Sequence, residues 1–464
     1  MDWARPVSGI RRGVVRDEVV TAGVDTSTRL GWTSFSPIGR CRAALAVVVM
    51  FATVGKLVLA ARTFGTGDVA RWGAFARGVT HAGPVGVYRL HFRAVPLFSH
   101  HHHLHHHHHY WLYNHPPLIG YMLSLVNAAT QRGVSFPLAI RVPAISADVV
   151  TCFLVLELLR TRRSLAEAFA AATLVALSPI LLVISGYHGN TDPVFIMLSL
   201  LSVYLLVDRR TPGLAGLSIA IALGVKIVPV VIVPTLLVFA IRAGGRVALR
   251  FVLSMGALIA LTWAPVVTQV WQPFRHDVLD YGGTGGRPRW GLAKLAAIIG
   301  HPSWVTNHGT PGRYITVFVV TVIPAVLVLR RPWLVVEASA LGLVGLLALT
   351  PAFGMQYLAW AAVPAYLLSF GGATAFNSFG GFLLIEIYNR ASGGFPWYHT
   401  ELLNKTTAAE QLALLGVWMT LVVVMIAGIR RIIRARRPPP TMVHAQSRPL
   451  ATPPQAVRET LPSS

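Results

Sequence analysis

One acidic residue stands where the chain leaves its first apolar run, in the stretch FGTGDVARWGAFARG. Asp68 is one of only 17 acidic residues among 464, and glycines beside it suit a chain that leaves a helix. A carboxylate there could accept a proton from a hydroxyl nucleophile, which is general base chemistry. The alternative is an acid in a solvated loop.

Two further ionisable residues lie within an apolar segment. Arg141 and Asp148 are about two helical turns apart, so they share one face of a helix expected over 138–159. Ionisable groups inside a membrane span are costly and face a cavity or a partner. This pair therefore predicts either pairing between helices or a part in binding.

A lysine interrupts the apolar stretch IAIALGVKIVPVVIVP. The charge of Lys226 requires an anion or a water-filled cavity at this position. A phosphate near a membrane face would satisfy it, because an ammonium is a compact cation. The competing interpretation is that the side chain extends to the interface and leaves its charge in water.

The most conspicuous feature is a histidine run, in which nine histidines occupy the ten positions 100–109. Imidazoles suit zinc, copper or nickel. The run, however, has no fixed spacing and no accompanying carboxylate or cysteine, and Cys41 and Cys152 are far apart. We predict a low-complexity loop insertion without a defined metal site; adventitious metal binding and a pH-sensitive loop are the alternatives.

The sequence contains no nucleotide-binding motif. It lacks a Walker loop, an HExxH motif and a serine elbow, and the glycine-rich YGGTGG at 281–286 has no flanking strand and helix. We therefore predict no cofactor.

The elements that hold these residues are predicted to be membrane helices. The chain is 54% hydrophobic and only 12% charged, whereas a soluble domain carries about 25% charged residues. Apolar runs long enough to cross a hydrocarbon core recur along it. Its net charge of +23 comes from arginines at the ends of these runs, which is the positive-inside pattern and argues against nucleic-acid binding.

Counting crossings between the basic clusters predicts about twelve passes. Residues 1–42 form a cytoplasmic segment, 43–430 the transmembrane domain and 431–464 a disordered cytoplasmic tail. A long first outer loop follows the first helix, and segment 116–130 is short and begins with two prolines, which predicts an interfacial or re-entrant helix. This topology places Asp68, the segment 63–137, the GYHGNTD loop and TPAFGMQ on the outer face, and Lys226 toward the same face.

Four stretches, in order, resemble the GT-C glycosyltransferases, polytopic enzymes that use polyprenyl-phosphate-linked sugars. They are GDVARWGAFARG; YNHPPLIGYMLSL with RVPAISADVVTCFLVLELL; SGYHGNTDPVFIMLSLLSVYLL with ALGVKIVPVVIVPTLLV; and FGMQYLAWAAVPAYLL. Together they cover about residues 60–370. The resemblance implies an all-α GT-C-like bundle that needs no metal.

The resemblance also implies roles for individual residues. Asp68 would be the catalytic base of an inverting sugar transfer, and Lys226, with Arg141, would hold the donor phosphate. The sugar or acceptor pocket would be lined by His188, Asn190, Asp192 and Gln356. We further predict substrate contacts for the residues just after the histidine run, Tyr113, Asn114 and His115.

The predicted function is a multi-pass glycosyltransferase of the bacterial plasma membrane. It would transfer a hexose such as mannose or glucose from a polyprenyl-phosphate donor to a lipid-linked or cell-envelope glycan acceptor on the extracytoplasmic side. The alternative is a transporter or flippase of a lipid-linked glycan, which predicts inverted repeats with matching broken helices. Only one broken hairpin, near Lys226, is visible in the sequence.

Overall fold

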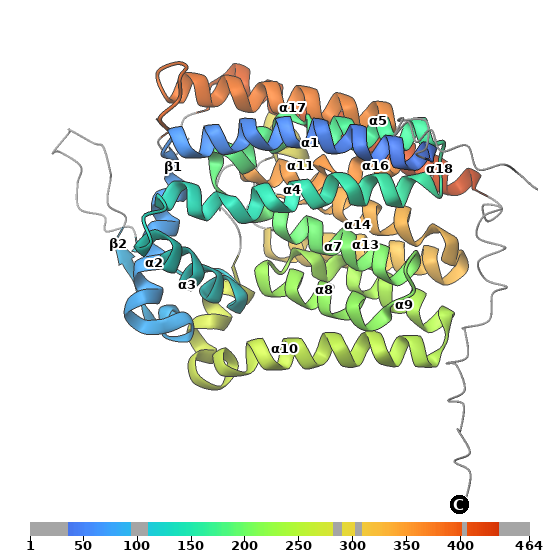
Figure 1. Ribbon diagram of the computed structural model, residues 1–464, viewed down its shortest axis with the longest axis horizontal. Helices are drawn as coiled ribbons and strands as arrows, with labels where there is room; N and C mark the ends of the chain where they lie inside the picture. Colours follow the sequence, from blue (N-terminus) through green and yellow to red (C-terminus); the bar gives the residue numbers. More distant parts are fainter. Residues whose placement is uncertain (1–35, 94–109, 282–289, 302–308, 401–405, 436–464) are drawn as a thin grey trace, which may run out of the picture.

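The computed structural model describes residues 36–93, 110–281, 290–301, 309–400 and 406–435 as a bundle of helices lying side by side (Figure 1). The longer elements are α1 (Pro37–Arg62), α2 (Gly67–Gly86), α3 (Pro117–Gln131), α4 (Phe136–Arg160), α5 (Leu165–Ala176), α7 (Asp192–Val207), α8 (Pro212–Val225), α9 (Val233–Ala243), α10 (Gly245–Phe274), α13 (Gly309–Arg330), α14 (Val335–Leu349), α17 (Phe370–Ala391) and α18 (Ala408–Arg434).

Short elements connect the long helices. Four are α-helices: α6 (Pro179–Val183), α11 (Gly291–Ile298), α15 (Ala359–Ala362) and α16 (Pro364–Leu368). Two are π-helical turns, Ile184–His188 and Arg275–Leu279. The 3₁₀ turns are Val87–Arg89, Val228–Ile232, Pro332–Leu334 and Met355–Leu358, and the two-residue strands are β1 (Gly65–Thr66), β2 (Phe92–Arg93), β3 (Tyr110–Trp111) and β4 (His399–Thr400).

Six of the described helical segments are long and apolar enough to cross a membrane: Pro37–Arg62, Phe136–Arg160, Leu165–His188, Gly245–Leu279, Pro332–Leu349 and Ala408–Arg434. Shorter apolar helices lie among them, including the two halves of the predicted hairpin, α8 and α9, which are separated at Lys226. The prediction of an all-α polytopic membrane protein is confirmed, and the number of about twelve passes stays a prediction.

The first and last helices extend past residues 43 and 430, the predicted limits of the transmembrane domain. The first helix begins at Pro37 rather than at residue 43, because the Ser36 hydroxyl caps it by accepting a hydrogen bond from the Gly39 amide (3.2 Å). The last helix continues to Arg434 rather than ending at 430. Arginine can remain helical while its long stem carries the guanidinium to water. The basic clusters therefore do not mark the helix ends.

α1 and α4 are joined by buried polar contacts, as one of the two interpretations of Arg141 and Asp148 predicted. Lys56 Nζ lies 2.6 Å from Asp148 Oδ2, with both side chains almost fully buried. Arg141 donates to the carbonyls of Ala60, Thr63 and Phe64 at 2.6–3.1 Å. These carbonyls lie at the end of α1, where a helix leaves them without internal partners.

The predicted interfacial segment is α3, which is 15 residues long. It measures about 22 Å at 1.5 Å per residue, less than a hydrocarbon core of about 30 Å. It packs against α2 at one end of the bundle (Figure 1). β2 and β3 pair antiparallel at the same end, and the histidine run between them lies outside the described residues.

A short parallel pairing closes the chain on itself. Gly65 and Thr66 of β1 align with His399 and Thr400 of β4, and the Gly65 amide also donates to the carbonyl of Tyr398 (3.0 Å). The end of the first helix is thereby attached to the segment that follows α17.

We expect Gly65→Ala to destabilise the protein strongly. A Cβ at this position would lie 1.8 Å from Arg141 Nη2, and the residue has φ = +97°, which glycine tolerates best. Overpacking together with backbone strain should cost about 3 kcal/mol or more. Thermal unfolding of the purified protein in detergent measures the loss.

Gly83→Ala is the matched control for this substitution. Gly83 also has positive φ (+76°), but a Cβ added there would have no other atom within 4 Å. The Gly83→Ala variant should therefore lose only the stability that the backbone strain costs. Equal loss of thermal stability in the two variants would contradict the close approach of Arg141 to Gly65.

Candidate active site

Asp68 lies in the first turn of α2, directly after the β1–β4 pairing. The Thr66 hydroxyl caps this helix by accepting a hydrogen bond from the Asp68 amide (3.3 Å), and it donates to the carbonyl of His188 (2.9 Å). A carboxylate in the first turn is stabilised by the helix dipole. The Asp68 side chain is 13% exposed, so the carboxylate is held in place while one edge stays accessible.

His188 links Asp68 to a tyrosine on a distant helix. Its Nε2 lies 3.0 Å from Asp68 Oδ2, and its Nδ1 forms a short hydrogen bond with the hydroxyl of Tyr388 on α17. An ionised carboxylate only accepts, which assigns the ring proton to Nε2. In the neutral imidazole, Nδ1 then accepts from the tyrosine hydroxyl. The three groups form a chain of donors that ends on Asp68.

The π-helical turn Ile184–His188 positions this histidine. A Cβ at Gly186 would meet Cα of Lys56 at 3.2 Å, so the turn packs closely on α1. Gly189 ends the turn in the left-handed conformation (φ = +77°). Single π-helical turns are frequent at functional sites because they redirect one side chain.

A second cation stands beside the carboxylate. Arg71, one turn along α2, places Nη1 3.4 Å from Asp68 Oδ1. Burial by itself raises the pKa of Asp68, but the hydrogen bond from His188 and the positive charge of Arg71 outweigh it and hold the pKa below the usual 3.8. Asp68 is therefore ionised at neutral pH and can accept a proton.

His115 lies in the same region and is neutral. Its ring stacks on Trp72, with centroids 4.3 Å apart. Burial, followed by the charges of Lys226 and Arg71, lowers the pKa of His115 to about 3, although Asp68 acts in the opposite direction. His115 is thus influenced by the charges of both Asp68 and Lys226.

Lys226 is not the lone cation that the sequence indicated. Its ammonium forms a short ion pair with Asp192, whose side chain is fully buried. The other carboxylate oxygen of Asp192 accepts from the Trp360 indole (2.9 Å). The ammonium also lies 5.1–5.8 Å from three ring centroids, those of Phe195, Tyr357 and Trp360.

This arrangement leaves Lys226 able to bind a further anion. Its side chain is 20% exposed, and an ammonium has three donors, of which Asp192 takes one. Since Asp192 is fixed by Trp360, the lysine is held in place before any ligand arrives. We call Lys226, Asp192, Phe195, Tyr357 and Trp360 the lysine cage.

Other predicted site residues have structural contacts. The Asn190 amide oxygen accepts from the Asp192 amide (3.0 Å), which fixes the start of α7. The hydrogen bonds of Arg141 go to the end of α1, so its contacts favour a positioning role over the predicted phosphate contact. The Gln356 amide folds over Gly354, where a Cβ would lie 2.7 Å from its oxygen.

The residues after the histidine run also take different places. Tyr113 is fully buried, packs edge-to-face on Phe75 and Tyr88, and its hydroxyl has no hydrogen-bond partner within the described part of the chain. Asn114 hydrogen-bonds to Tyr281. Burial raises the pKa of that tyrosine, and the positive charge of Arg71 acts to lower it. Asn114 is thus linked through Tyr281 to the surroundings of Arg71 and Asp68, whereas Tyr113 lies among aromatic side chains.

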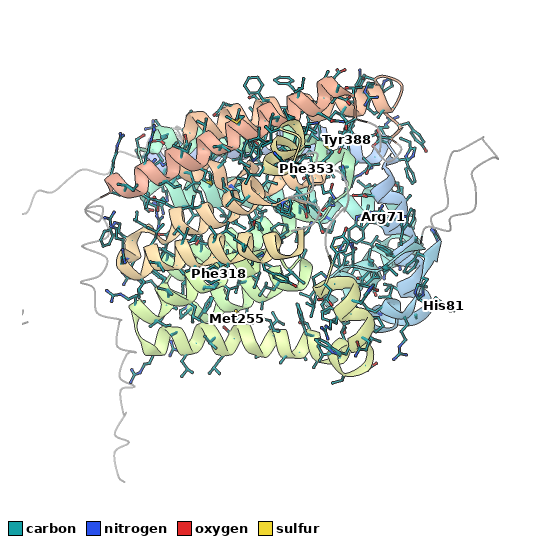
Figure 2. All side chains as sticks on the ribbon, turned by 180° about the vertical axis from the view of Figure 1, so that it is seen from behind. Arg71, His81, Met255, Phe318, Phe353 and Tyr388 are labelled. Carbon is teal, nitrogen blue, oxygen red and sulfur yellow. The ribbon has the colours of Figure 1, made fainter. Side chains whose placement is uncertain are left out.

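Several residues of this region were not predicted from the sequence: Arg71, Trp72, Tyr281, Tyr357, Trp360 and Tyr388. Spacing could have identified Arg71, because it follows Asp68 by one turn on the same helix. Nothing local could have identified Tyr388, which is 200 residues from its partner His188. Figure 2 shows Arg71 and Tyr388 at the same end of the bundle.

The site combines an ionised carboxylate that can take a proton with a caged ammonium that can stabilise a leaving anion. His115 lies within electrostatic reach of both groups. The groups come from α2, the turn before α7, the break after α8 and α17. These are the components of a transfer reaction in which a hydroxyl attacks and an anionic group leaves.

One family model matches the chain, that of glycosyltransferase family 87, over residues 113–353. This is a little over half of the 464 residues. The matched segment includes His188, Asp192 and Lys226, whereas Asp68 and Tyr388 lie on either side of it. No curated protein matches the chain.

Proposed function

Because the chain belongs to glycosyltransferase family 87, a family of GT-C type membrane glycosyltransferases, we propose that it transfers a hexose from a polyprenyl-phosphate donor. The acceptor would be a hydroxyl of a lipid-linked or cell-envelope glycan, with the site on the extracytoplasmic face. The observation that carries the proposal is that the Asp68 carboxylate, held by His188 and Arg71, and the caged ammonium of Lys226 both act on the same buried imidazole, that of His115.

In the proposed step, Asp68 orients the acceptor hydroxyl and takes its proton. The hydroxyl oxygen forms a bond to the anomeric carbon from the face opposite the phosphate. The bond between that carbon and the phosphate oxygen breaks, and its electron pair leaves with polyprenyl phosphate, so the configuration inverts. Lys226 stabilises the negative charge on the departing phosphate, and Asp68 then releases the proton to water.

His188 and Tyr388 have supporting roles in this proposal. The hydrogen bond that His188 donates lowers the basicity of Asp68 but fixes the orientation of its carboxylate. Tyr388 holds His188 in the tautomer that donates. In this proposal Asn114, His115 and Gln356 contact the substrate, while Asn190 fixes the start of α7 and Asp192 holds Lys226.

The direct test supplies the purified protein with defined polyprenyl-phosphate sugars. Labelled mannosyl and glucosyl donors are each mixed with a membrane glycolipid extract, and glycolipid products are separated. Transfer from a lipid-monophosphate donor but not from a sugar nucleotide supports the proposal. Transfer from a sugar nucleotide alone would contradict the donor class while leaving the enzyme class intact.

We expect Tyr388→Phe to lower kcat about 10-fold or more with little change in KM. Without the hydroxyl, Nδ1 of His188 loses its donor, the tautomer is free to change, and the hydrogen bond to Asp68 weakens. The pKa of Asp68 should then rise toward 3.8, so the acid limb of the rate profile moves to higher pH. The measurement is the pH dependence of kcat.

The control for that variant is Tyr366→Phe. Tyr366 lies on α16 and is as buried as Tyr388, and among the described residues the hydrogen bonds and ion pairs of His188 and Asp68 go to other side chains. It should leave the acid limb in place. If both variants lower activity equally without a shift in pH, the tyrosine has a packing role only.

A further inference from the structure

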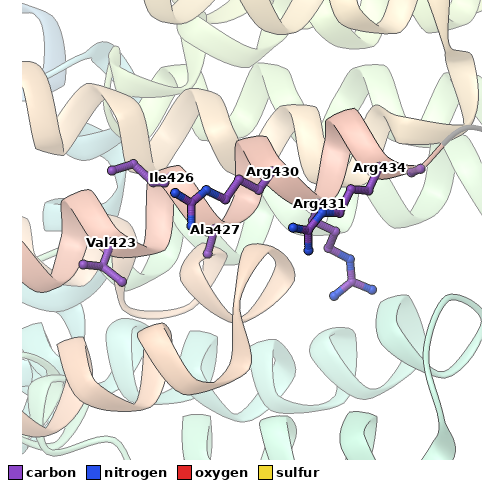
Figure 3. Close-up of a pocket in the computed structure, with 7 residues that line it drawn as sticks. Val423, Ile426, Ala427, Arg430, Arg431 and Arg434 are labelled. Atoms are coloured by element: carbon purple, nitrogen blue, oxygen red, sulfur yellow. The ribbon is translucent and has the colours of Figure 1, made fainter.

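A groove remote from the lysine cage lies along the last helix. Its volume is about 710 Å³, and its lining includes Val423, Ile426, Ala427, Arg430, Arg431 and Arg434 (Figure 3). The structure thus places an apolar surface and three guanidinium groups in one hollow. We propose that this groove binds an anionic glycerophospholipid, with an acyl chain on the apolar part and the phosphate on the arginines.

The chemistry of the groove changes along the helix. Val423 and Ile426 are 55% and 42% exposed, and Figure 3 shows that the arginines follow them toward the C-terminal end of α18. The lining residues that the structure describes include no acidic side chain. The described lining residues therefore leave the positive charge of the groove uncompensated, and a bound anion would neutralise it.

The groove passes from an apolar part to a basic part along one helix. From Val423 to Ala427 the helix rises about 6 Å at 1.5 Å per residue, and the basic part extends over about 10 Å more to Arg434. α18 is one of the helices long and apolar enough to cross a membrane. In a membrane, the apolar residues would lie at the depth of an acyl chain and the arginines at the depth of its phosphate.

Neighbouring arginines increase the charge at this end of the bundle. Arg331 donates through Nη1 to the carbonyl of Ile432 (3.0 Å), next to the groove. Arg163 donates to the carbonyl of Leu367 (2.7 Å) on α16, which packs against α18. Arg163 is also paired with Glu167 (2.5 Å), so its charge is largely neutralised, and the added positive field comes mainly from Arg331. An anionic lipid is favoured over a zwitterionic one, whose headgroup carries its own cation.

The test is native mass spectrometry of the purified full chain with phosphatidylglycerol or phosphatidylcholine. We expect phosphatidylglycerol to bind about 10-fold or more tightly than phosphatidylcholine. Arg430→Gln combined with Arg434→Gln should reduce that preference by about 10- to 30-fold. Replacing the same two residues by lysine keeps the charge and should preserve most of the preference, which separates lost binding from lost folding.

A matched control removes equal charge from another helix end. Arg246 and Arg250 are exposed at the start of α10, and changing both to glutamine should leave the preference within about 2-fold. Equal losses in the two glutamine pairs would overturn the proposal in favour of general surface charge. Complete displacement of the lipid by millimolar inorganic phosphate would overturn it too, because the acyl chain would then add nothing.

Discussion

Asp68→Asn is expected to lower the rate of sugar transfer by about 10²- to 10⁴-fold, the usual contribution of a general base. Asparagine has the same shape and can still accept the hydrogen bond that His188 donates from Nε2. It cannot take the proton of the acceptor hydroxyl. The loss should therefore appear in kcat, with donor KM changed by less than about 3-fold. The measurement uses labelled lipid-linked sugar and purified protein.

The control for this prediction is Asp280→Asn. Asp280 lies after the second π-helical turn, is 52% exposed and pairs loosely with Arg275 (3.5 Å). An exposed pair of this kind contributes little to stability, so the variant should retain wild-type activity. Near wild-type transfer by Asp68→Asn, with unchanged thermal stability, would refute the proposed role of Asp68 as the base.

Lys226→Met is expected to reduce kcat/KM for the donor by about 10²-fold or more, because the departing phosphate loses its cation. The single variant is ambiguous. It also leaves the fully buried Asp192 carboxylate without its partner, and breaking a buried ion pair is strongly destabilising, by about 3–5 kcal/mol. Lower activity in this variant could then follow from lower stability.

The double variant Lys226→Met with Asp192→Asn separates the two effects. It removes both charges, and the new asparagine can still accept from Trp360, whose indole lies 2.9 Å from Asp192 Oδ2. We expect its thermal stability to return most of the way to wild type while donor transfer stays low. Recovery of transfer along with stability would mean that Lys226 serves only to neutralise Asp192.

The helical architecture could be predicted because membrane helices follow from apolar length and charge position. The break between α8 and α9 at Lys226, the turn between α13 and α14 after Arg330 and the shortness of α3 are all properties of local sequence. The helix ends were less accurate at α1 and α18. The positions of the arginines indicate where the membrane ends and water begins. The residue at which the helix itself ends depends instead on capping.

The candidate site was predictable only in part. Asp68 and Lys226 are unusual in their own surroundings, so the sequence identified them as candidates. Their partners are ordinary residues that become informative through tertiary contacts: Tyr388 resembles any tyrosine in an apolar helix until the fold places it against His188. Arg141 is the opposite case. It is unusual in the sequence because it is a charged residue in an apolar segment, yet its hydrogen bonds go to the end of α1.

The pairing of β1 with β4 has a consequence for the order of events during synthesis. Residues 65–66 leave the ribosome more than 300 residues before residues 399–400, which bind them. Until α17 is inserted, His188 lacks Tyr388 and the turn before Asp68 lacks its neighbouring strand. A nascent chain that has not yet inserted α17 would therefore contain Asp68 and the lysine cage but lack Tyr388 and β4. Exposure to lipid-linked sugar would be unproductive until the last part of the protein enters the membrane.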